Sequence, residues 1–258
     1  MPCVPVEIAI VVPVYNEADN ILPLAEEVVA AMRRQPRSFE LVFVDDASTD
    51  GTWERIAEAA RRFPQVRGLR HERNAGQSAA LWTGWRATDA PILATLDGDL
   101  QNDPADLPRL LETLAGVDFV SGMRVNRRDN ALRRFSSVVA RWMRRWVLGA
   151  DFRDTGCAVR VFRREVLDVV PAFNGLHRFL PVLVRAGGFQ TREVPVNHRP
   201  RRAGVSKYGV WNRLGRGIHD LIGVRWYLKR QLRPVPVREL PVPEPPPASA
   251  PPEPPARS

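Results

Sequence analysis

Residues 8–46 read IAIVVPVYNEADNILPLAEEVVAAMRRQPRSFELVFVDD, two short apolar runs separated by a longer amphipathic one. The runs at 8–14 and 40–45 are almost continuously apolar and rich in β-branched residues, which is typical of strands buried on both faces. Residues 21–34 repeat their apolar side chains at helical spacing. Strands separated by helices in this way predict a mostly parallel sheet with helices on both faces.

The same alternation continues along the first half of the chain. Further strands are predicted at 66–70, 92–97 and 118–122, and further helices at 52–63, 78–87 and 107–114. These elements define an α/β fold. Ligands of such sheets bind beyond the carboxyl ends of the strands, so the residues that follow the strands are the first candidates for a site.

Polar residues follow three of the predicted strands. They are Tyr15, Asn16 and Glu17 after the first, Asp45 and Asp46 after the second, and Asp97 and Asp99 after the fourth. In TLDGDLQNDP (95–104) the two carboxylates suit a divalent cation, because hard cations take carboxylate oxygens and bring a substrate phosphate with them. A solvated turn is the alternative, since Asp, Asn and Gly are turn formers.

Two other stretches also have two interpretations. VDDASTDGT (44–52) is either a ligand loop or a loop in which Ser48 or Thr49 caps the next helix. NAGQSAALWTGW (74–85) is either a glycine turn whose following helix offers N–H groups to an anion or a plain helix start. Neither a G-x-G-x-x-G after the first strand nor a G-x-x-x-x-G-K-[ST] occurs, which disfavours dinucleotide and P-loop sites.

The formal charge of +9 is unevenly distributed. Residues 1–119 hold 11 basic and 19 acidic side chains, residues 120–232 hold 24 and 7, and residues 233–258 hold 3 and 3. A basic half suits a nucleic acid, an anionic membrane or a phosphorylated ligand, and charge alone does not choose among them. Because residues 233–258 contain 11 of the 24 prolines, we expect one catalytic domain over 1–232 and a disordered tail over 233–258.

Cysteine usage and hydropathy limit the cellular setting. Cys3 and Cys157 are the only cysteines and Cys3 lies at the terminus, so we expect a reducing compartment. The four histidines lack the spacing of a zinc site. The start lacks a secretory signal, and no run of about 18 apolar residues occurs, so no membrane-spanning helix is expected.

Six motifs occur in the order and approximate spacing of family 2 glycosyltransferases. They are VVPVYNEADNI, FVDDASTDGTW, RNAGQSAAL, LDGDLQNDP, SGMR and HRPRRAGVSKYG. The chain most closely resembles the dolichol-phosphate mannosyltransferase-like branch, which glycosylates polyprenyl phosphates. The resemblance implies the GT-A fold, a Rossmann-like nucleotide-binding sheet with the nucleotide-sugar lying over the strand ends.

The resemblance also implies roles for residues on the donor side. The base and ribose of the nucleotide are expected at Pro13, Tyr15, Glu17, Val44 and Asp46. Asp97, Asp99 and Gln101 match the D-x-D motif that binds Mg²⁺ or Mn²⁺ against the leaving diphosphate. Gly98 is expected to let the ligand approach closely.

The basic half is expected to bind phosphates, because two phosphorylated substrates that meet at one carbon need cations. The family positions for the donor diphosphate or the acceptor phosphate are Arg124, Arg133, Ser137, Arg201 and Lys207. The arginines expected to be solvated surface charges are Arg127, Arg128, Arg163 and Arg164.

The implied reaction is an inverting transfer of a mannose- or glucose-type sugar. An oxygen of the lipid phosphate attacks the anomeric carbon, and the nucleoside diphosphate leaves. A phosphomonoester has a second pKa of about 6 and is already an anion at neutral pH, so no strong general base is required. Asp154 in DTGC is the candidate catalytic residue, placed where relatives hold a carboxylate near the acceptor; a structural cap is the alternative.

Two arginine- and tryptophan-rich segments, 131–149 and 210–232, are amphipathic. Helices of this kind lie in the membrane interface, although part of each could pack on the core. We therefore expect a cytoplasmic protein attached peripherally to the anionic cytoplasmic face of the membrane. A separate membrane-protein partner could provide the attachment instead.

Two rival functions remain open from the sequence. One is a family 2 glycosyltransferase acting on a sugar hydroxyl in cell-envelope polysaccharide synthesis, which would need a carboxylate base. The other is a nucleic-acid-binding protein that uses the basic half. No recognised nucleic-acid-binding module is visible, so we expect no nucleic-acid partner.

Overall fold

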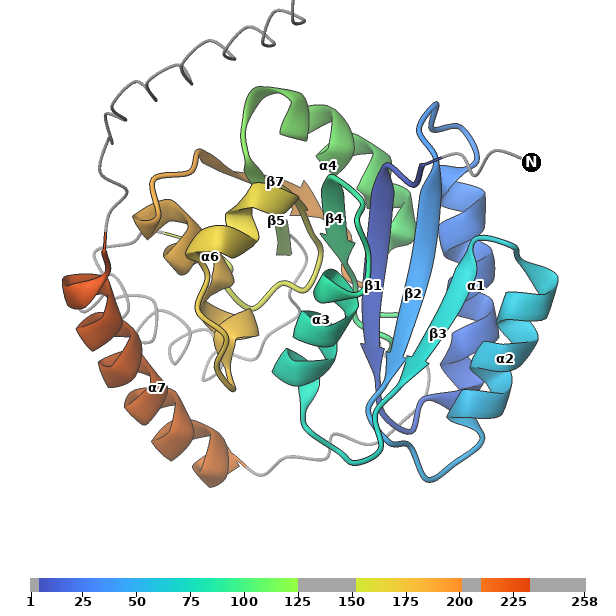
Figure 1. Ribbon diagram of the computed structural model, residues 1–258, viewed down its shortest axis with the longest axis horizontal. Helices are drawn as coiled ribbons and strands as arrows, with labels where there is room; N and C mark the ends of the chain where they lie inside the picture. Colours follow the sequence, from blue (N-terminus) through green and yellow to red (C-terminus); the bar gives the residue numbers. More distant parts are fainter. Residues whose placement is uncertain (1–4, 125–151, 201–209, 233–258) are drawn as a thin grey trace, which may run out of the picture.

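The computed structural model describes residues 5–124, 152–200 and 210–232, without the side chains of 210–218 (Figure 1). Seven strands form one sheet in the order β3-β2-β1-β4-β6-β5-β7. The strands are β1 (Ile8–Val14), β2 (Phe39–Asp45), β3 (Val66–Arg70), β4 (Ile92–Thr95), β5 (Phe119–Arg124), β6 (Arg160–Arg163) and β7 (Thr191–Val196). The helices are α1 (Ala18–Met32), α2 (Thr52–Arg62), α3 (Gln77–Arg86), α4 (Leu107–Thr113), α6 (Leu176–Ala186) and α7 (Val210–Arg230), with short 3₁₀ turns η1 (Pro104–Asp106), η2 (Leu114–Gly116) and η3 (Arg164–Val169).

The predicted α/β fold is confirmed, and each element predicted up to residue 122 is present within a few residues of its expected bounds. Strand β1 pairs in parallel with β2 and β4, and β2 pairs in parallel with β3. Strand β6 is antiparallel to β4 and β5, while β7 is parallel to β5. The sequence did not predict β6 or β7, because β6 has only four residues and β7 (TREVPV) is polar in its first half and contains a proline.

The continuous apolar strands follow from burial on both faces. Ile8, Ile10 and Val12 pack in a cluster with residues of α1 and α4. Ala9 and Val11 point the other way, into a second cluster with residues of α3, α6 and α7. Figure 1 shows α1 and α2 on one side of the sheet and α3 on the other. Because β1 is buried on both faces, an alternating polar pattern is impossible there.

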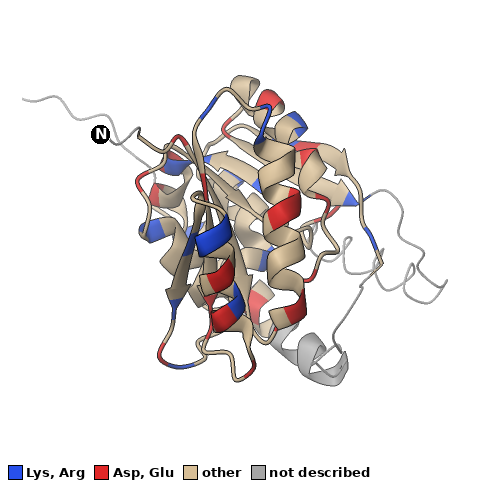
Figure 2. Cartoon of the chain, turned by 90° about the vertical axis from the view of Figure 1, so that its right-hand side faces the viewer, with Lys and Arg blue, Asp and Glu red and all other residues tan. Residues whose placement is uncertain are grey.

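The solvent side of α1 and α2 carries charged residues of both signs (Figure 2). Arg55 pairs with Glu58 at 2.8 Å, and Arg62 lies 3.9 Å from Glu26 on the neighbouring helix. These exposed pairs contribute little to stability, about 0–1 kcal/mol each. The buried clusters on the two faces of the sheet therefore supply most of the stability.

Close packing of α3 on the sheet gives a test of the fold. A Cβ added to Gly84 would overlap Val11 Cγ1 and lie 3.0 Å from Val44 Cγ2. Replacing a helical glycine by alanine normally stabilises by roughly 0.5–1 kcal/mol, but the overlap should dominate here. We expect Gly84→Ala to lower the free energy of unfolding by about 1–3 kcal/mol in urea titrations.

Gly223→Ala is the matched control, because nothing lies within 4 Å of a Cβ added at that position of α7. It should leave stability unchanged or raise it. If Gly84→Ala stabilised the protein as much as Gly223→Ala, the packing of α3 against β1 described above would be wrong.

Candidate active site

Four loops meet at the carboxyl edge of β1–β4, because these four strands are parallel to one another. In the described part of the chain, the three residues other than glycine with positive φ are Asn16 (55°), Ala47 (60°) and Leu100 (59°). One lies in each loop that follows β1, β2 and β4. Non-glycine residues in this conformation carry strain of order 1–3 kcal/mol and gather at functional sites. The backbone itself therefore marks this edge as the candidate site.

The loops after β1 and β2 are held together by direct hydrogen bonds. The Asn16 N–H donates to Ser48 Oγ at 2.9 Å, and the Thr49 N–H donates to Asn16 Oδ1 at 2.8 Å. Helix α2 begins after Gly51, so the alternative in which Ser48 or Thr49 caps it is wrong. Ser48 instead fixes the position of the segment that contains Tyr15 and Glu17.

The base and ribose candidates lie along this junction of β1 and β2. Pro13 and Val44 are register partners across the two strands. Tyr15 is the most exposed of the set, and the Glu17 carboxylate accepts a hydrogen bond from Asn20 Nδ2 at 2.6 Å. The structure thus brings the five candidates of this group to one place, and their contact with a nucleotide stays a prediction.

The Asp46 carboxylate holds the third loop in place. Its oxygens accept hydrogen bonds from the backbone N–H groups of Ala75 at 2.8 Å and Gly76 at 2.7 Å. His71 Nδ1 lies 2.8 Å from Asp46 Oδ1, and only 3% of Asp46 is exposed. Asp46 thus connects the end of β2 to the start of α3. Its predicted contact with the base or ribose would have to share these oxygens.

Asp97, Asp99 and Gln101 share the loop after β4. Gln77 Nε2, at the start of α3, donates to Asp97 Oδ1 at 2.9 Å. Asp99 is largely buried and accepts a hydrogen bond from the Gln101 N–H at 3.2 Å. A Cβ on Gly98 would lie 2.6 Å from Val14 Cγ1, so the glycine is needed for packing against β1. Its expected role in the approach of a ligand stays a prediction.

The donor set of this loop fits a hard divalent cation. Two carboxylates and one amide oxygen are the ligand types that Mg²⁺ accepts, and Mg²⁺ usually keeps waters and substrate phosphates as its other ligands. No group of three or more His, Cys, Asp or Glu side chains in the described residues is arranged to hold a metal. Two carboxylates and an amide leave the remaining positions of such an ion to waters and a substrate phosphate.

Arg199 attaches the loop after β4 (residues 96–103, the candidate metal loop) to the rest of the edge. Its N–H donates to the Gln101 carbonyl at 2.8 Å, and its guanidinium pairs with Asp103 at 2.7 Å and Glu27 at 2.6 Å. Glu27 belongs to α1, so one side chain joins α1, the metal loop and the segment after β7. Arg199 was not predicted from the sequence, because the residues that it contacts lie up to 172 positions away.

Arg124 and Asp154 form a bidentate ion pair. Arg124 Nε donates to Asp154 Oδ2 at 2.7 Å, and Arg124 Nη2 donates to Asp154 Oδ1 at 2.8 Å. The hydrogen bond with Asp154 raises the pKa of Arg124 above its usual value, against the opposing effect of burial. The structure thus pairs Arg124, which was predicted to bind a phosphate, with Asp154, the candidate catalytic carboxylate. Since both its oxygens are occupied, Asp154 is placed to orient Arg124.

A second polar cluster, which the sequence did not predict, lies behind the edge. Ser78 Oγ lies 2.6 Å from His177 Nδ1 and accepts a hydrogen bond from the Gly175 N–H at 2.9 Å. Ser78 Oγ and His177 Nδ1 share this hydrogen bond, and the tautomer of the neutral imidazole decides which of them donates. Burial, helped by the charges of Arg160 and Arg178, lowers the pKa of His177 from 6.5 to about 3. The sequence offered one signal of this cluster: Arg160, whose charge acts on His177, stands at the start of the apolar run RVF (160–162).

The remaining predicted residues divide into two groups. Arg133, Ser137, Arg201 and Lys207 lie outside the described residues, as do Arg127, Arg128 and segment 131–149. Arg163 is exposed, as expected. Arg164 was expected to be a solvated charge, and this is wrong: its guanidinium donates to the carbonyls of Ala90, Trp85 and Thr88.

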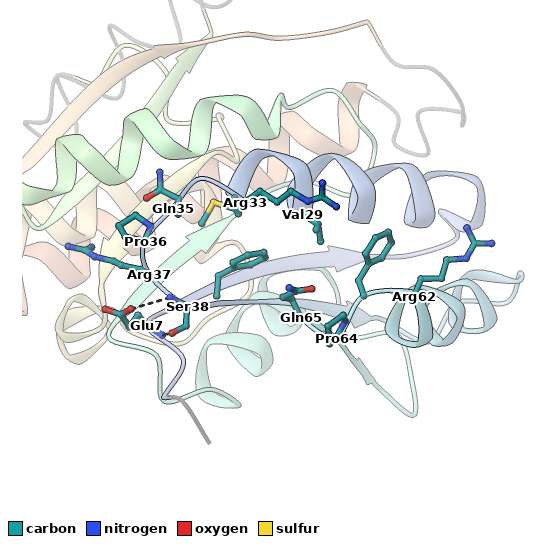
Figure 3. Close-up of a pocket in the computed structure, with 13 residues that line it drawn as sticks. Glu7, Val29, Arg33, Gln35, Pro36, Arg37, Ser38, Arg62, Pro64 and Gln65 are labelled. Atoms are coloured by element: carbon teal, nitrogen blue, oxygen red, sulfur yellow. Dashed lines mark hydrogen bonds between the residues drawn. The ribbon is translucent and has the colours of Figure 1, made fainter. Parts of the chain in front are cut away.

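A separate depression lies at the opposite edge of the sheet (Figure 3). It is lined by Glu7, Val29, Met32, Arg33, Gln35, Pro36, Arg37, Ser38, Phe39, Arg62, Phe63, Pro64 and Gln65. These residues lie near the amino ends of β1 and β2, where α/β sheets do not bind their ligands. None of the predicted site residues belongs to it, so we do not regard it as the active site.

Comparison with known proteins identifies related sequences. Residues 9–171 match the family described as "Glycosyl transferase family 2". The chain is 36% identical over 239 residues to dodecaprenyl-phosphate galacturonate synthase of Rhizobium johnstonii, covering 90% of this chain and 70% of the relative. It is 34% identical over 217 residues to undecaprenyl-phosphate 4-deoxy-4-formamido-L-arabinose transferase of Aeromonas hydrophila, covering 83% and 66%. The chain thus spans about two thirds of the length of these relatives.

Solved structures show the same fold. Glucosyl-3-phosphoglycerate synthase from Mycobacterium tuberculosis, crystallised with Mn²⁺, UDP and phosphoglyceric acid, superposes with a TM-score of 0.65. The match covers 84% of this chain and 78% of that one, at 22% sequence identity. This likeness confirms the predicted GT-A fold.

The buried histidine makes stability depend on pH. Because the pKa of His177 is about 3 in the folded protein and 6.5 is its ordinary value, the unfolded chain binds more protons between these values. Stability should therefore fall as pH decreases below about 6.5. We expect His177→Gln, which stays neutral, to lose less thermal stability than the parent protein between pH 7.5 and pH 5.

His219→Gln is the matched control, since His219 is exposed on α7. It should show the same pH dependence as the parent protein. Equal losses of melting temperature in the parent protein and His177→Gln would contradict the neutral, buried state of His177.

Proposed function

This chain belongs to glycosyltransferase family 2, and we propose that it transfers a sugar from a nucleotide-sugar to a polyprenyl phosphate. The observation that carries the proposal is the similarity, over 90% of the chain, to an enzyme named for a dodecaprenyl-phosphate product. The edge formed by β1, β2 and β4 supports it, because carboxylates for a metal and a cation for a phosphate lie at that edge or next to it. A nucleic-acid-binding function has no comparable support.

On the donor side, the nucleotide moiety would lie over the junction that contains Tyr15, Glu17 and Asp46. Asp97, Asp99 and Gln101 would hold Mg²⁺ or Mn²⁺, which would neutralise the charge that develops on the leaving diphosphate. Gln77 orients Asp97 from α3, and Arg199 fixes the backbone of Gln101. These contacts keep the loop in one conformation before the donor binds.

On the acceptor side, a phosphomonoester is already an anion at neutral pH, so the chain needs no strong general base. Arg124, held by Asp154, would contact a phosphate oxygen without moving, because the ion pair fixes its guanidinium plane. Arg133, Ser137, Arg201 and Lys207 complete the predicted phosphate contacts. One displacement at the anomeric carbon inverts its configuration.

The identity of the sugar is a separate question. A mannose- or glucose-type sugar was expected, whereas the two relatives described above are named for galacturonate and 4-deoxy-4-formamido-L-arabinose. Both names share the polyprenyl phosphate and differ in the sugar. We therefore assign the acceptor class, and we expect the side chains at this chain's own candidate site to decide which sugar is transferred.

We also propose a catalytic domain over 1–232 and a non-catalytic segment over 233–258.

Helix α7 supports attachment to a membrane surface. Leu221 and Val224 are buried against the domain, while Ile222 and Trp226 are each 63% exposed on the outer side. Basic residues, Lys229 and Arg230, end the helix. No helix in the described ranges has the length and apolar character needed to span a bilayer. We propose that the outer side of α7 lies in the interface of the anionic cytoplasmic leaflet, near the headgroup of the acceptor.

The first test is an acceptor assay. Purified protein, Mg²⁺ or Mn²⁺ and labelled nucleotide-sugars are incubated with polyprenyl phosphate, free polyprenol or a sugar acceptor, and the lipid phase is extracted. We expect label only with polyprenyl phosphate, and a loss of roughly hundredfold or more for Asp97→Asn or Asp99→Asn, because the diphosphate loses its counter-charge.

Asp89→Asn is the control for this assay, since Asp89 is exposed in the loop before β4, at the other edge of the sheet. It should retain the parent activity. Transfer to a sugar hydroxyl without lipid phosphate would support the rival glycosyltransferase function, and full activity of both aspartate variants in EDTA would remove the metal assignment.

The second test is flotation with liposomes. The protein should float with vesicles that contain anionic lipid and detach as salt rises, because attraction between exposed charges is screened. Replacing Ile222 and Trp226 together by serine should abolish flotation, while Gly223→Ala on the same helix should not. Flotation of the serine variant equal to the parent would exclude α7 as the contact and favour a separate membrane-protein partner.

A further inference from the structure

Glu193 binds the backbone of the segment that contains Asp154. It lies on β7, where its register partner is Ser121 of β5. Its Oε1 accepts hydrogen bonds from the backbone N–H groups of Arg153 at 3.0 Å and Asp154 at 3.1 Å, and its Oε2 lies 3.1 Å from the same Arg153 nitrogen. Residues 152–159 belong to no helix or strand, so side chains must bind N–H groups that a β-ladder would otherwise pair. Glu193 binds two of them in a row.

The side chain that this backbone orients is Arg124. The Asp154 carboxylate accepts hydrogen bonds from the backbone N–H of Arg124 at 3.3 Å and from its Nε and Nη2 at 2.7 and 2.8 Å. Neither side-chain bond uses Nη1, which would be the nitrogen that donates to a phosphate oxygen. The pair is largely shielded, with 15% of the Arg124 side chain and 10% of the Asp154 side chain exposed. Asp154 therefore fixes the plane of the guanidinium, and Glu193 fixes the backbone of Asp154.

The turn at Asp154–Gly156 closes tightly on the same guanidinium. The Gly156 N–H donates to Asp154 Oδ1 at 3.2 Å, which keeps the carboxylate bent back over its own turn. A Cβ added to Gly156 would lie only 3.1 Å from Arg124 Nη2. In packing this close, a shift of the turn by a few tenths of an ångström displaces its neighbour. The position of the backbone that Glu193 binds therefore sets the position of the Arg124 guanidinium.

Arg124 lies at the edge of the sheet that carries the candidate metal loop. Strand β6 is antiparallel to both β4 and β5, so β4 and β5 run in the same direction. Arg124 ends β5, and its carboxyl end therefore lies at the same edge as the loop after β4. The hydrogen bond with Asp154 is the main cause of the raised pKa of Arg124, and the charge of Asp97 adds to it. The guanidinium is thus within electrostatic reach of the metal loop.

Asp118 makes the same type of bond at the opposite edge. It directly precedes β5, and its Oδ2 accepts a hydrogen bond at 2.9 Å from the N–H of Gln190, which directly precedes β7. Since β5 and β7 are parallel, Asp118 lies at their amino ends, whereas Arg124 lies at the carboxyl end. Asp118 therefore provides a carboxylate-to-backbone bond beside the same two strands, away from the candidate site.

We propose that Glu193 is a positioning residue of the transfer reaction. By binding the backbone of residues 153–154 it holds Asp154, and through Asp154 it holds the Arg124 guanidinium where that group meets the phosphate of the lipid acceptor. This inference rests on the proposed function, which supplies the acceptor phosphate. An arginine binds a phosphate best when its planar donors are already oriented, because less freedom is lost on binding. Glu193 acts without contacting a substrate.

The test is steady-state kinetics with undecaprenyl phosphate, Mg²⁺ or Mn²⁺ and the nucleotide-sugar that gives a lipid-linked product in the acceptor assay. We expect Glu193→Ala to raise the KM for undecaprenyl phosphate roughly tenfold and to leave the KM for the nucleotide-sugar unchanged. Glu193→Gln keeps one acceptor oxygen and should give an intermediate KM. Asp118→Ala, the matched control, loses the same type of bond and should leave both KM values unchanged.

A double-mutant cycle separates positioning from a general structural role. If Glu193 acts through Arg124, its removal should matter only while the guanidinium is present. Arg124→Met should raise the KM for undecaprenyl phosphate, and adding Glu193→Ala to that variant should change the KM by less than about twofold. Additive effects of the two substitutions would mean that Glu193 acts independently of Arg124, which would overturn the inference. If the alanine variant does not fold, Glu193→Gln takes its place in the cycle, since it fills the same space.

Other outcomes distinguish this inference from the proposed function. An unchanged KM for undecaprenyl phosphate in Glu193→Ala, while the parent protein forms the lipid-linked product, would remove the inference and leave the function intact. Equal increases of the KM in Glu193→Ala and Asp118→Ala would mean that Glu193 is only structural. An increase confined to the KM for the nucleotide-sugar would overturn the assignment to the acceptor. Absence of a lipid-linked product from every donor in the parent protein would instead contradict the function.

Discussion

The oxygens of the Asp46 carboxylate accept hydrogen bonds from the backbone N–H groups of Ala75 and Gly76. These contacts fix the start of α3 against the end of β2, and the positions of Gln77 and Ser78 follow from them. Gln77 then reaches Asp97 after β4, and Ser78 reaches His177 on α6. One buried carboxylate thus sets the relation between the end of β2, the loop after β4 and the Ser78–His177 cluster. Loss of that carboxylate would separate groups that lie on four different elements.

The strained backbone at this edge has a compensating set of contacts. Ala47 and Leu100 adopt positive φ without the freedom of glycine, at a cost of order 1–3 kcal/mol each. The loop of Ala47 is held by Ser48 and by Asp46, and the loop of Leu100 by Arg199. Strain of this kind persists only where neighbouring contacts leave no alternative conformation. The same contacts keep the carboxylates in place before a ligand binds, which reduces the entropy lost on binding.

The front of the sheet was predictable because burial on both faces leaves a continuous apolar pattern in β1, β2 and β4, and the polar residues that follow them were visible for the same reason. Strand β6 was not, since four residues give no period and two of them are arginines. Arg160 and Arg164 look alike in the sequence, and only the folded chain shows that all three nitrogens of the Arg164 guanidinium donate to backbone carbonyls, whereas Arg160 makes one such bond. The pairing of Arg124 with Asp154, 30 residues away, likewise depends on the arrangement of β5 and the loop before β6.

The balance of charge at the edge agrees with the proposed divalent metal. Arg124 is already matched by Asp154, and Arg199 by Glu27 and Asp103, so neither offers a net positive charge to an arriving diphosphate. A nucleotide-sugar that approaches Asp97 and Asp99 would meet like charge unless a divalent cation accompanies it. The arginine pairs then serve mainly to fix geometry, and the cation supplies the attraction. On this view the affinity for a nucleoside diphosphate should follow the metal.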